Sequence, residues 1–269
     1  LSPGQFTTVQ FSSTRLDFVA KTIDGAPIIL LHDSSTPRFR PALQLKYLTA
    51  EFHATCLIHS GDQAIDGQFA IIQCDPDSPE LYELFIRSVV AATANLPPNA
   101  GTDEIRIRFE KLANLFSRFL KPSGREVSGL WAELFVIAQS FDIPLAVACW
   151  RADAHNRFDF VWNKVNLEVK ATTHTIRSHD FALEQLEKPS GGKGFVVSLL
   201  LQSLNGGVGV MHLATEIERA LPMNSELRQK VWTNIAADLG SDFGSSLDKE
   251  FDRDYAQRHA VLFNMEDIP

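Results

Sequence analysis

The chain has 269 residues and lacks several features that would place it in a class of protein at once. No apolar run approaches the ~20 residues that span a bilayer, and the longest candidate, FVVSLLL at residues 195–201, has the length of a buried strand. The start, LSPGQFTTVQFSSTR, has neither an initiator Met nor the apolar core of a signal peptide. We therefore expect a trimmed, cytoplasmic protein with no membrane partner.

Cysteine is scarce: Cys56, Cys74 and Cys149 are an odd number and form no CxxC spacing. This pattern argues against a disulfide framework and against a cysteine-rich zinc site. The eight histidines are scattered, and His174 and His179 are five residues apart, which is not the spacing of a helical metal site. We expect reduced, structural thiols and no zinc.

The common glycine-rich motifs of nucleotide binding and acyl transfer are missing too. GGKG at residues 191–194 does not satisfy GxxxxGK[ST], and GGVG at residues 206–209 lacks the strand–GxGxxG–helix context. No GxSxG occurs, although a chance Ser–His–Asp arrangement stays open. A flexible loop and a hairpin turn are the simpler interpretations of the two glycine runs.

The net charge of −8 argues at first against a nucleic-acid partner, but the charge is unevenly spread. Between Ile105 and Arg125 six basic residues face one acidic residue, Glu110. Such a stripe is either the electrostatic footprint of a nucleic-acid surface or an ordinary solvated helix face. The candidate DNA contacts in it are Arg118, Lys121 and Arg125.

The pattern of apolar residues divides the chain near residue 78. Residues 1–78 are predicted to be β-rich and to serve recognition or partner contacts, and residues 79–269 are predicted to form a mixed α/β domain. The expected strands are 28–31, 43–45, 48–58, 68–74, 195–201, 208–212 and 260–263. The expected helices are 80–94, 103–120, one from the capping box Ser123–Glu126 to about 140, 180–188, 215–220 and 226–239.

The stretch RFDFVWNKVNLEVKAT (residues 157–172) predicts two strands joined by a polar turn. A turn centred on Lys164–Val165 would pair Trp162 with Leu167 and continue outward from there. Since side chains alternate faces with a period of two, one face of this hairpin is entirely apolar.

The opposite face carries Asp159, Val161, Glu168 and Lys170, with Asp159 expected opposite Lys170. Directly opposite residues have Cβ atoms ~5 Å apart, so two carboxylates and one ammonium would share a small volume. Taken alone, this pattern favours an ordinary half-solvated hairpin with one cross-strand ion pair, because Asp-x8-Glu-x-Lys is short and frequent by chance.

Glu133 is a second, independent anomaly. In SGLWAELFVIAQ its helical neighbours three and four residues away are Gly129, Leu130, Val136 and Ile137, all apolar. A carboxylate on a packing face is unfavourable unless it is paired or binds a metal, although a rim position that reaches water is an alternative. Together with the hairpin, Glu133 favours three carboxylates and a lysine meeting where a helix packs on a sheet.

These residues resemble the motifs of the PD-(D/E)XK nuclease superfamily, and more closely a group of bacterial PD-(D/E)XK-motif proteins linked to phage defence. The resemblance matches Glu133 to the helix Glu, Asp159 to the motif Asp, and Glu168 and Lys170 to E-x-K. Gln185 matches the polar residue that often follows on the next helix. Phe158 stands where the motif has proline, and the matched part covers only residues 129–186.

The resemblance implies a restriction endonuclease-like α/β core that hydrolyses DNA with Mg²⁺, or with Mn²⁺ as a substitute. Asp159, Glu168 and the Val169 carbonyl would be the oxygen ligands, with Glu133 close to the ion. Lys170 would act as a base, orient water or stabilise charge, and these three roles stay open. The phosphate or water contacts implied nearby are Gln185, Arg177 and His179.

The resemblance also implies a homodimer, since many restriction-like nucleases dimerise to cut both strands, and other defence-system subunits are possible partners. Three alternatives stay open: a catalytically silent module of the same fold that binds DNA or docks subunits, a nuclease for RNA or branched DNA, and a structural α/β domain with a coincidental motif. The sequence does not specify a recognised base sequence, a modification or an activating nucleotide.

Overall fold

The structure is a computed structural model that describes residues 7–38, 40–60, 63–121, 126–152, 157–182, 192–222 and 226–267. The chain divides into two compact units, Leu1–Lys121 and Pro122–Pro269. In the parts of the chain that the structure describes, no helix is long and apolar enough to cross a membrane. The mixed α/β class expected from the sequence is confirmed.

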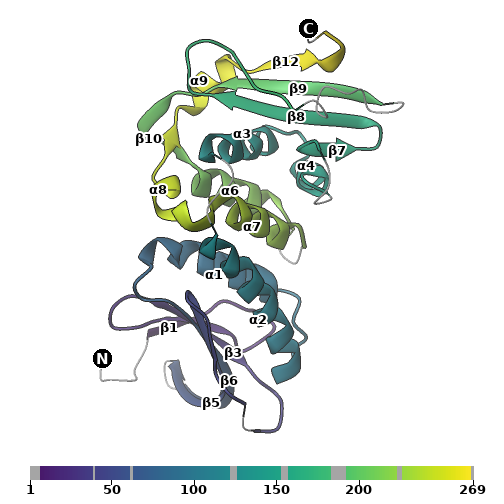
Figure 1. Cartoon of the computed structure of the whole chain (residues 1–269). Helices are drawn as coiled ribbons and strands as arrows, with labels where there is room; N and C mark the ends of the chain where they lie inside the picture. Colours follow the sequence, from purple (N-terminus) through teal and green to yellow (C-terminus); the bar gives the residue numbers. More distant parts are fainter. Residues whose placement is uncertain are drawn as a thin grey trace. The chain divides into compact units, whose positions relative to one another are not determined.

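The N-terminal unit is a six-stranded antiparallel sheet with two helices packed against it (Figure 1). Its strand order is β1-β2-β3-β6-β5-β4. Helix α1 contacts β3, and helix α2 contacts β5. The elements are β1 (Thr7–Gln10), β2 (Phe18–Lys21), β3 (Pro27–His32), β4 (Leu43–Gln44), β5 (Leu48–Ser60), β6 (Gln63–Cys74), η1 (Pro79–Leu81), α1 (Tyr82–Thr93), α2 (Thr102–Phe116) and η2 (Ser117–Leu120).

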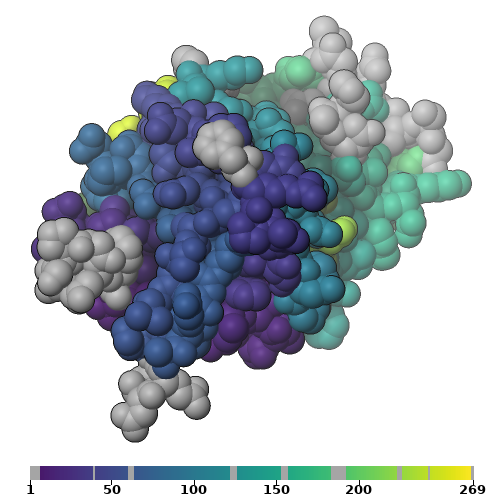
Figure 2. Space-filling view, turned by 90° about the horizontal axis from the view of Figure 1, so that it is seen from below, coloured from purple at the N-terminus to yellow at the C-terminus, as the bar shows by residue number. Residues whose placement is uncertain are grey.

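Apolar side chains of neighbouring strands form the core of this sheet. Phe18 on β2 pairs with Leu30 on β3, and its ring lies 6.2 Å, edge to face, from that of Phe69 on β6. Ile58 on β5 joins the same buried cluster. Figure 2 shows residues of this unit, purple to blue, as a closely packed surface. The four predicted N-terminal strands are confirmed as β3 to β6, whereas β1 and β2 were not predicted.

The boundary between the compact units lies at Lys121–Pro122, not near residue 78 as the sequence indicated. Helices α1 and α2 belong to the N-terminal unit because they pack on its sheet, and Tyr47 places its ring 6.3 Å from that of Phe119. The change from strand to helix periodicity at residue 79 marks a change of element type inside one unit.

The C-terminal unit contains a four-stranded mixed sheet with the order β12-β9-β8-β7. Strands β8 and β9 are parallel, and the two outer pairs are antiparallel. Strands β10 and β11 form a separate two-stranded antiparallel sheet. The strands are β7 (Phe160–Trp162), β8 (Val165–Thr172), β9 (Lys193–Leu200), β10 (Ser203–Gly209), β11 (Glu250–Phe251) and β12 (Val261–Asn264).

Helix α3 contacts β8 on one side and α6 on the other, so it is covered by sheet and helices alike (Figure 1). This position explains its sequence, VSGLWAELFVIA, in which Glu133 is the sole charged residue. The helices are α3 (Val127–Ala138), α4 (Ile143–Cys149), α6 (Val210–Ala220), α7 (Glu226–Leu239), α8 (Phe243–Leu247) and α9 (Arg253–Arg258), with 3₁₀ turns η3 (Gly240–Asp242) and η4 (Met265–Asp267).

The register of the 157–172 hairpin differs from the predicted one by two residues. Trp162 pairs with Val165, where Leu167 was predicted, and the loop consists of Asn163 and Lys164. Asn163 has a φ of 52°, a conformation that asparagine adopts more easily than most residues, and this tightens the turn. Because the shift is an even number of residues, the assignment of side chains to faces is unchanged.

Other local predictions were wrong for identifiable reasons. Residues 208–212 are not a strand: β10 ends at Gly209 and α6 begins at Val210. Helix α4 was missed, although Asp142 caps it by accepting a 2.9 Å bond from the Leu145 amide. Glu126 is the N-cap of α3, whereas the predicted capping box placed it at helix position N3 with Ser123 as the N-cap. Ser123 lies outside the described residues. Most of the predicted 180–188 helix also lies outside them.

Candidate active site

A polar pocket of about 320 Å³ opens in the C-terminal unit. The start of α3, the segment before β7, and β8 all contribute to its lining. The pocket brings together four residues that the sequence singled out, together with the Val169 position between two of them. They are Glu133, Asp159, Glu168 and Lys170.

Glu133 occupies the α3 side of this pocket and is only 3% exposed. The Trp150 indole nitrogen donates to its Oε2 at 2.5 Å, and Arg151 Nη2 donates to its Oε1 at 2.7 Å. The side chain therefore turns inward, toward the sheet, and does not reach bulk water as a rim position would.

The surroundings of Glu133 change its acidity. Burial and the nearby Asp159 carboxylate raise the pKa of Glu133 to about 7, although Arg151 and the Trp150 hydrogen bond act in the opposite direction. A carboxyl that titrates near neutrality in a pocket is a frequent property of functional sites.

Asp159 lies just before β7 and is 8% exposed. Its Oδ2 accepts a 2.8 Å hydrogen bond from the Val169 amide, so the carboxylate is fixed against the neighbouring strand. Its own carbonyl accepts a 2.7 Å bond from the Arg151 amide. Both the side chain and the main chain of Asp159 are thus held in place.

Glu168 and Lys170 lie two residues apart on β8 and point to the same face. Lys170 Nζ is 3.2 Å from Glu168 Oε1, and the Glu168 side chain is almost fully buried. Lys170 also lies 5.1 Å from the ring centre of Phe181. The lysine is therefore an ion-pair partner of a buried carboxylate and still reaches the pocket.

The donor set of this pocket suits a hard divalent cation. Asp159, Glu168 and the Val169 carbonyl offer oxygen atoms, and the carboxylates are buried close enough for Asp159 to perturb Glu133. Within the described part of the chain, no three His, Cys, Asp or Glu side chains form a ready-made metal cluster. Mg²⁺ does not require one, since it commonly binds one or two carboxylates and fills its shell with water and substrate phosphate.

The predicted phosphate contacts around this pocket have mixed outcomes. Arg177 Nη1 donates to the Ser198 carbonyl at 2.7 Å, its Nη2 donates to the His259 carbonyl at 2.6 Å, and His179 Nε2 lies 2.5 Å from Ser198 Oγ. Burial, Arg177 and Lys170 together lower the pKa of His179. These two residues hold the connection after β8 against β9, and neither lines the pocket. Gln185 lies outside the described residues.

The predicted basic surface lies in the other unit. Arg118 and Lys121 are exposed at the end of the N-terminal unit, and Arg125 lies outside the described residues. Within the same stretch, Arg106 pairs with Glu110 at 3.5 Å, as an ordinary surface helix does. Of the candidate DNA contacts that the structure describes, Arg118 and Lys121, neither lines the pocket.

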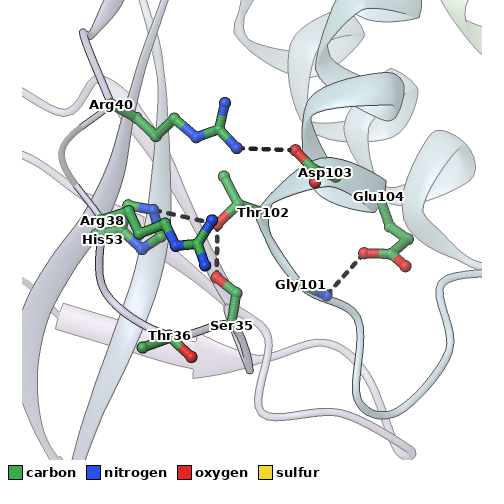
Figure 3. A pocket seen from close by; sticks show the side chains of 9 residues that line it. All are labelled: Ser35, Thr36, Arg38, Arg40, His53, Gly101, Thr102, Asp103 and Glu104. Carbon is green, nitrogen blue, oxygen red and sulfur yellow. Dashed lines mark hydrogen bonds and ion pairs between the residues drawn. The ribbon is translucent and has the colours of Figure 1, made fainter.

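A second pocket, of about 300 Å³, lies in the N-terminal unit (Figure 3). Beside it the buried Asp33 accepts hydrogen bonds from Ser35 Oγ at 2.6 Å and from Thr102 Oγ1 at 2.7 Å. His53 Nδ1 lies 3.6 Å from the same carboxylate. His53 has a φ of 59° at a bulge in β5, so this network fastens that bulge and the start of α2 to the end of β3.

Charges of both signs line this second pocket. Arg40 pairs with Asp103 at 3.2 Å, and Glu104 accepts a 3.0 Å bond from the Gly101 amide at the start of α2 (Figure 3). The network was not foreseen, because HDSSTP at residues 32–37 has the composition of a simple turn. Because positive and negative side chains both line this pocket, and because the Asp33 carboxylate is hydrogen-bonded within the protein, we interpret this region as structural.

The sequence analysis also missed Trp150 and Arg151, which follow α4 and contact Glu133 directly. The one available signal was that Glu133 lies on an apolar helix face, because a buried carboxylate requires a nearby hydrogen-bond donor or cation. Nothing in the sequence indicated which residue would supply it, because Arg151 reaches Glu133 through tertiary structure alone.

The chain matches the model of a known family. The family model described as "Putative PD-(D/E)XK family member, (DUF4420)" matches residues 8–269. Neither a search of curated proteins nor a search of solved structures gives a match. The match covers nearly the whole chain, including both compact units and every motif residue of the pocket, and the chain belongs to this PD-(D/E)XK family.

Proposed function

We propose that the protein is a metal-dependent DNA endonuclease whose active site is the C-terminal pocket. The observation that carries the proposal is the convergence of Glu133, Asp159, Glu168 and Lys170, from helix α3, the segment before β7 and strand β8, on one concave site. Membership of a PD-(D/E)XK family supports a nuclease-like role. A restriction endonuclease-like core, in which α3 packs on the mixed sheet, is part of the same proposal.

Asp159, Glu168 and the Val169 carbonyl would hold Mg²⁺ or Mn²⁺. A divalent cation bound there would make water more acidic and offset the negative charge that builds on the phosphate. Burial and the nearby Asp159 carboxylate raise the pKa of Glu133, which supports a site that a cation would stabilise.

Lys170 is the residue that would orient or deprotonate the attacking water, or stabilise the charged phosphate. Its Nζ lies 3.2 Å from Glu168 Oε1, so the ammonium is held in position by a group that also faces the pocket. Glu133 would bind the ion or one of the waters around it. The pocket lining also includes Arg157, a further cation near which a phosphate could lie.

A DNA substrate, a homodimer that cuts both strands, and a setting in phage defence with other subunits belong to the proposal through the family resemblance. The pocket chemistry is that of phosphodiester hydrolysis, which it would share with nucleases of RNA or branched DNA. Parallel assays on duplex DNA, RNA and branched DNA therefore decide the substrate.

The test is cleavage of supercoiled plasmid with Mg²⁺ or Mn²⁺, beside an EDTA control. Lys170→Ala is the informative variant, and Lys164→Ala is its matched control, because Lys164 is exposed at the tip of the same hairpin. We expect cleavage by the native protein and by Lys164→Ala, and none with EDTA or Lys170→Ala. Cleavage that persists in EDTA or in Lys170→Ala would overturn the mechanism.

A catalytically silent module that binds DNA or docks partner subunits is the second candidate. The observation in its favour is that the pocket's charged groups already pair within the protein: Glu168 with Lys170, and Glu133 with Arg151. DNA binding that weakens steeply with salt, without cleavage under either metal, would favour this module.

A further inference from the structure

The dipeptide Trp150–Arg151 holds Glu133 from two directions. Trp150 donates its indole N–H to one carboxylate oxygen, and Arg151 Nη2 lies 2.7 Å from each of the two oxygens. Trp150 is fully buried, and its backbone forms an isolated antiparallel bridge with Phe160 at the start of β7. The end of α4 is thus joined to both α3 and β7.

Arg151 has a second carboxylate partner, Asp238 on α7. Its Nη1 donates to Asp238 Oδ1 at 2.8 Å and its Nη2 to Asp238 Oδ2 at 2.7 Å, which is the two-pronged geometry that a guanidinium forms best. The two hydrogen bonds to Asp238 fix the orientation of the guanidinium plane, and this orientation directs Nη2 toward Glu133. A lysine in this place could carry the charge but not this geometry.

The backbone of Arg151 takes part as well. Its amide donates to the Asp159 carbonyl at 2.7 Å, and its φ is 44°, in the left-handed region that non-glycine residues avoid. Such a conformation costs about 1–3 kcal/mol and persists where surrounding contacts demand it. One residue therefore fixes the Glu133 side chain and the main chain at Asp159.

Stability alone is a poor explanation of this arrangement. Buried ion pairs often stabilise a fold no more than apolar residues of the same size, because removing the charges from water is unfavourable. At Arg151 a strained backbone conformation and a buried charge network occur together, beside the pocket. A need to hold the pocket carboxylates in one geometry explains this combination better.

We propose that Arg151 is a positioning residue that holds Glu133 and Asp159 in the geometry needed for catalysis, and that Asp238 orients Arg151. This inference rests on the proposed nuclease function. Arg151 acts through carboxylates and not on the phosphate, since its Nη1 is bonded to Asp238 and its Nη2 to both Asp238 and Glu133.

The variants are Arg151→Met, Arg151→Lys and Asp238→Asn. Arg253→Met is the matched control, because Arg253 forms a two-pronged pair with Glu216 at 2.6 and 2.9 Å in the same unit, away from the pocket lining. Cleavage kinetics give kcat and KM, and titration with Mn²⁺ alone gives metal affinity without turnover.

Residues that orient metal ligands typically change affinity or activity by 10- to 100-fold. We expect Arg151→Met to lower kcat or Mn²⁺ affinity by about that factor, with little change in KM for DNA. Arg151→Lys should recover part of the loss, and Asp238→Asn should show a smaller loss of the same kind. Arg253→Met should stay within about 2-fold of the native protein. Equal effects in Arg151→Met and Arg253→Met would overturn the inference.

The Trp150 indole gives a readout that does not depend on catalysis. The chain has four tryptophans, so four indole N–H signals are expected by NMR. We expect Asp238→Asn to shift the Trp150 signal, although Asp238 is not its hydrogen-bond partner, because the change passes through Arg151 and Glu133. If native protein neither binds Mn²⁺ nor cleaves, the proposed function fails; an unmoved Trp150 signal in Asp238→Asn contradicts the positioning role itself.

Discussion

The two units each bury a carboxylate cluster, and the clusters differ in what surrounds the charge. In the N-terminal unit Asp33 receives hydroxyl donors from Ser35 and Thr102, and it lies beside His53. In the C-terminal unit Glu133 and Asp159 line one pocket, and burial, together with the nearby Asp159 carboxylate, raises the pKa of Glu133 to about 7.

The comparison teaches that burial of an acid is not by itself a sign of function. A carboxylate surrounded by donors is satisfied and fastens segments together, as Asp33 fastens β3 to α2. Glu133 also has donors, Trp150 and Arg151, yet burial and the nearby Asp159 carboxylate still raise its pKa, so a further proton or cation would stabilise this pocket. The second arrangement is the one that we connect with chemistry.

The largest expected effect is on the pocket, from Glu168→Gln. Cleavage should fall by about 10³-fold, equivalent to about 4 kcal/mol of lost transition-state stabilisation, because an oxygen ligand and the partner of Lys170 are both altered. Plasmid cleavage rates measure this. Glu218→Gln is the matched control, since Glu218 is a buried glutamate of the same unit that accepts a 3.1 Å bond from Trp232. If both variants lost cleavage to a similar extent, the prediction that the pocket carboxylates differ from other buried acids would be wrong.

The next effect is on stability, from Asp33→Ala in the N-terminal unit. This variant removes the buried carboxylate to which the Thr102 and Ser35 hydroxyls both donate, leaving them only each other and His53, and it should lower the free energy of unfolding by about 3 kcal/mol. Denaturant unfolding measures the loss. Cleavage per folded molecule should not change, and a loss of cleavage beyond the loss of folded protein would show that the two clusters are not separate in function.

A smaller effect concerns pH and Glu133. The pKa of Glu133 is raised in the folded state from its usual 4.5 to about 7, so the folded protein binds this proton more tightly than the unfolded chain. The associated stability is fully present below pH 4.5 and is lost as pH rises through 7, an effect on the order of 3 kcal/mol at most. Glu133→Gln should flatten the stability curve between pH 4.5 and 7. A curve of unchanged slope in this variant would contradict the assignment.

Much of the site could be predicted from sequence because the period of two in a strand is strict. The face shared by Glu168 and Lys170 survives a two-residue error in the hairpin register, and an apolar helix made Glu133 conspicuous. A charged residue at an unexpected position of a regular helix or strand can therefore be recognised from the sequence alone.

The remainder depends on contacts between distant segments, which no local pattern encodes. Arg151 reaches Glu133 and Asp238 only after α3, α4 and α7 pack together, and Asp33 meets Thr102 only when α2 lies on the sheet. The unit boundary was misplaced for the same reason, since packing of α1 and α2 on the N-terminal sheet decides it.

The most direct test of the central claim compares Asp159→Asn with Asp33→Asn in one plasmid assay containing Mg²⁺. Both variants change a buried aspartate to its neutral isostere, one in each cluster. We predict that Asp159→Asn lowers cleavage by about 10³-fold, as Glu168→Gln does, while its thermal unfolding stays close to native, and that folded Asp33→Asn cleaves at the native rate. Cleavage by Asp159→Asn at the native rate would contradict the claim that the C-terminal pocket is the active site.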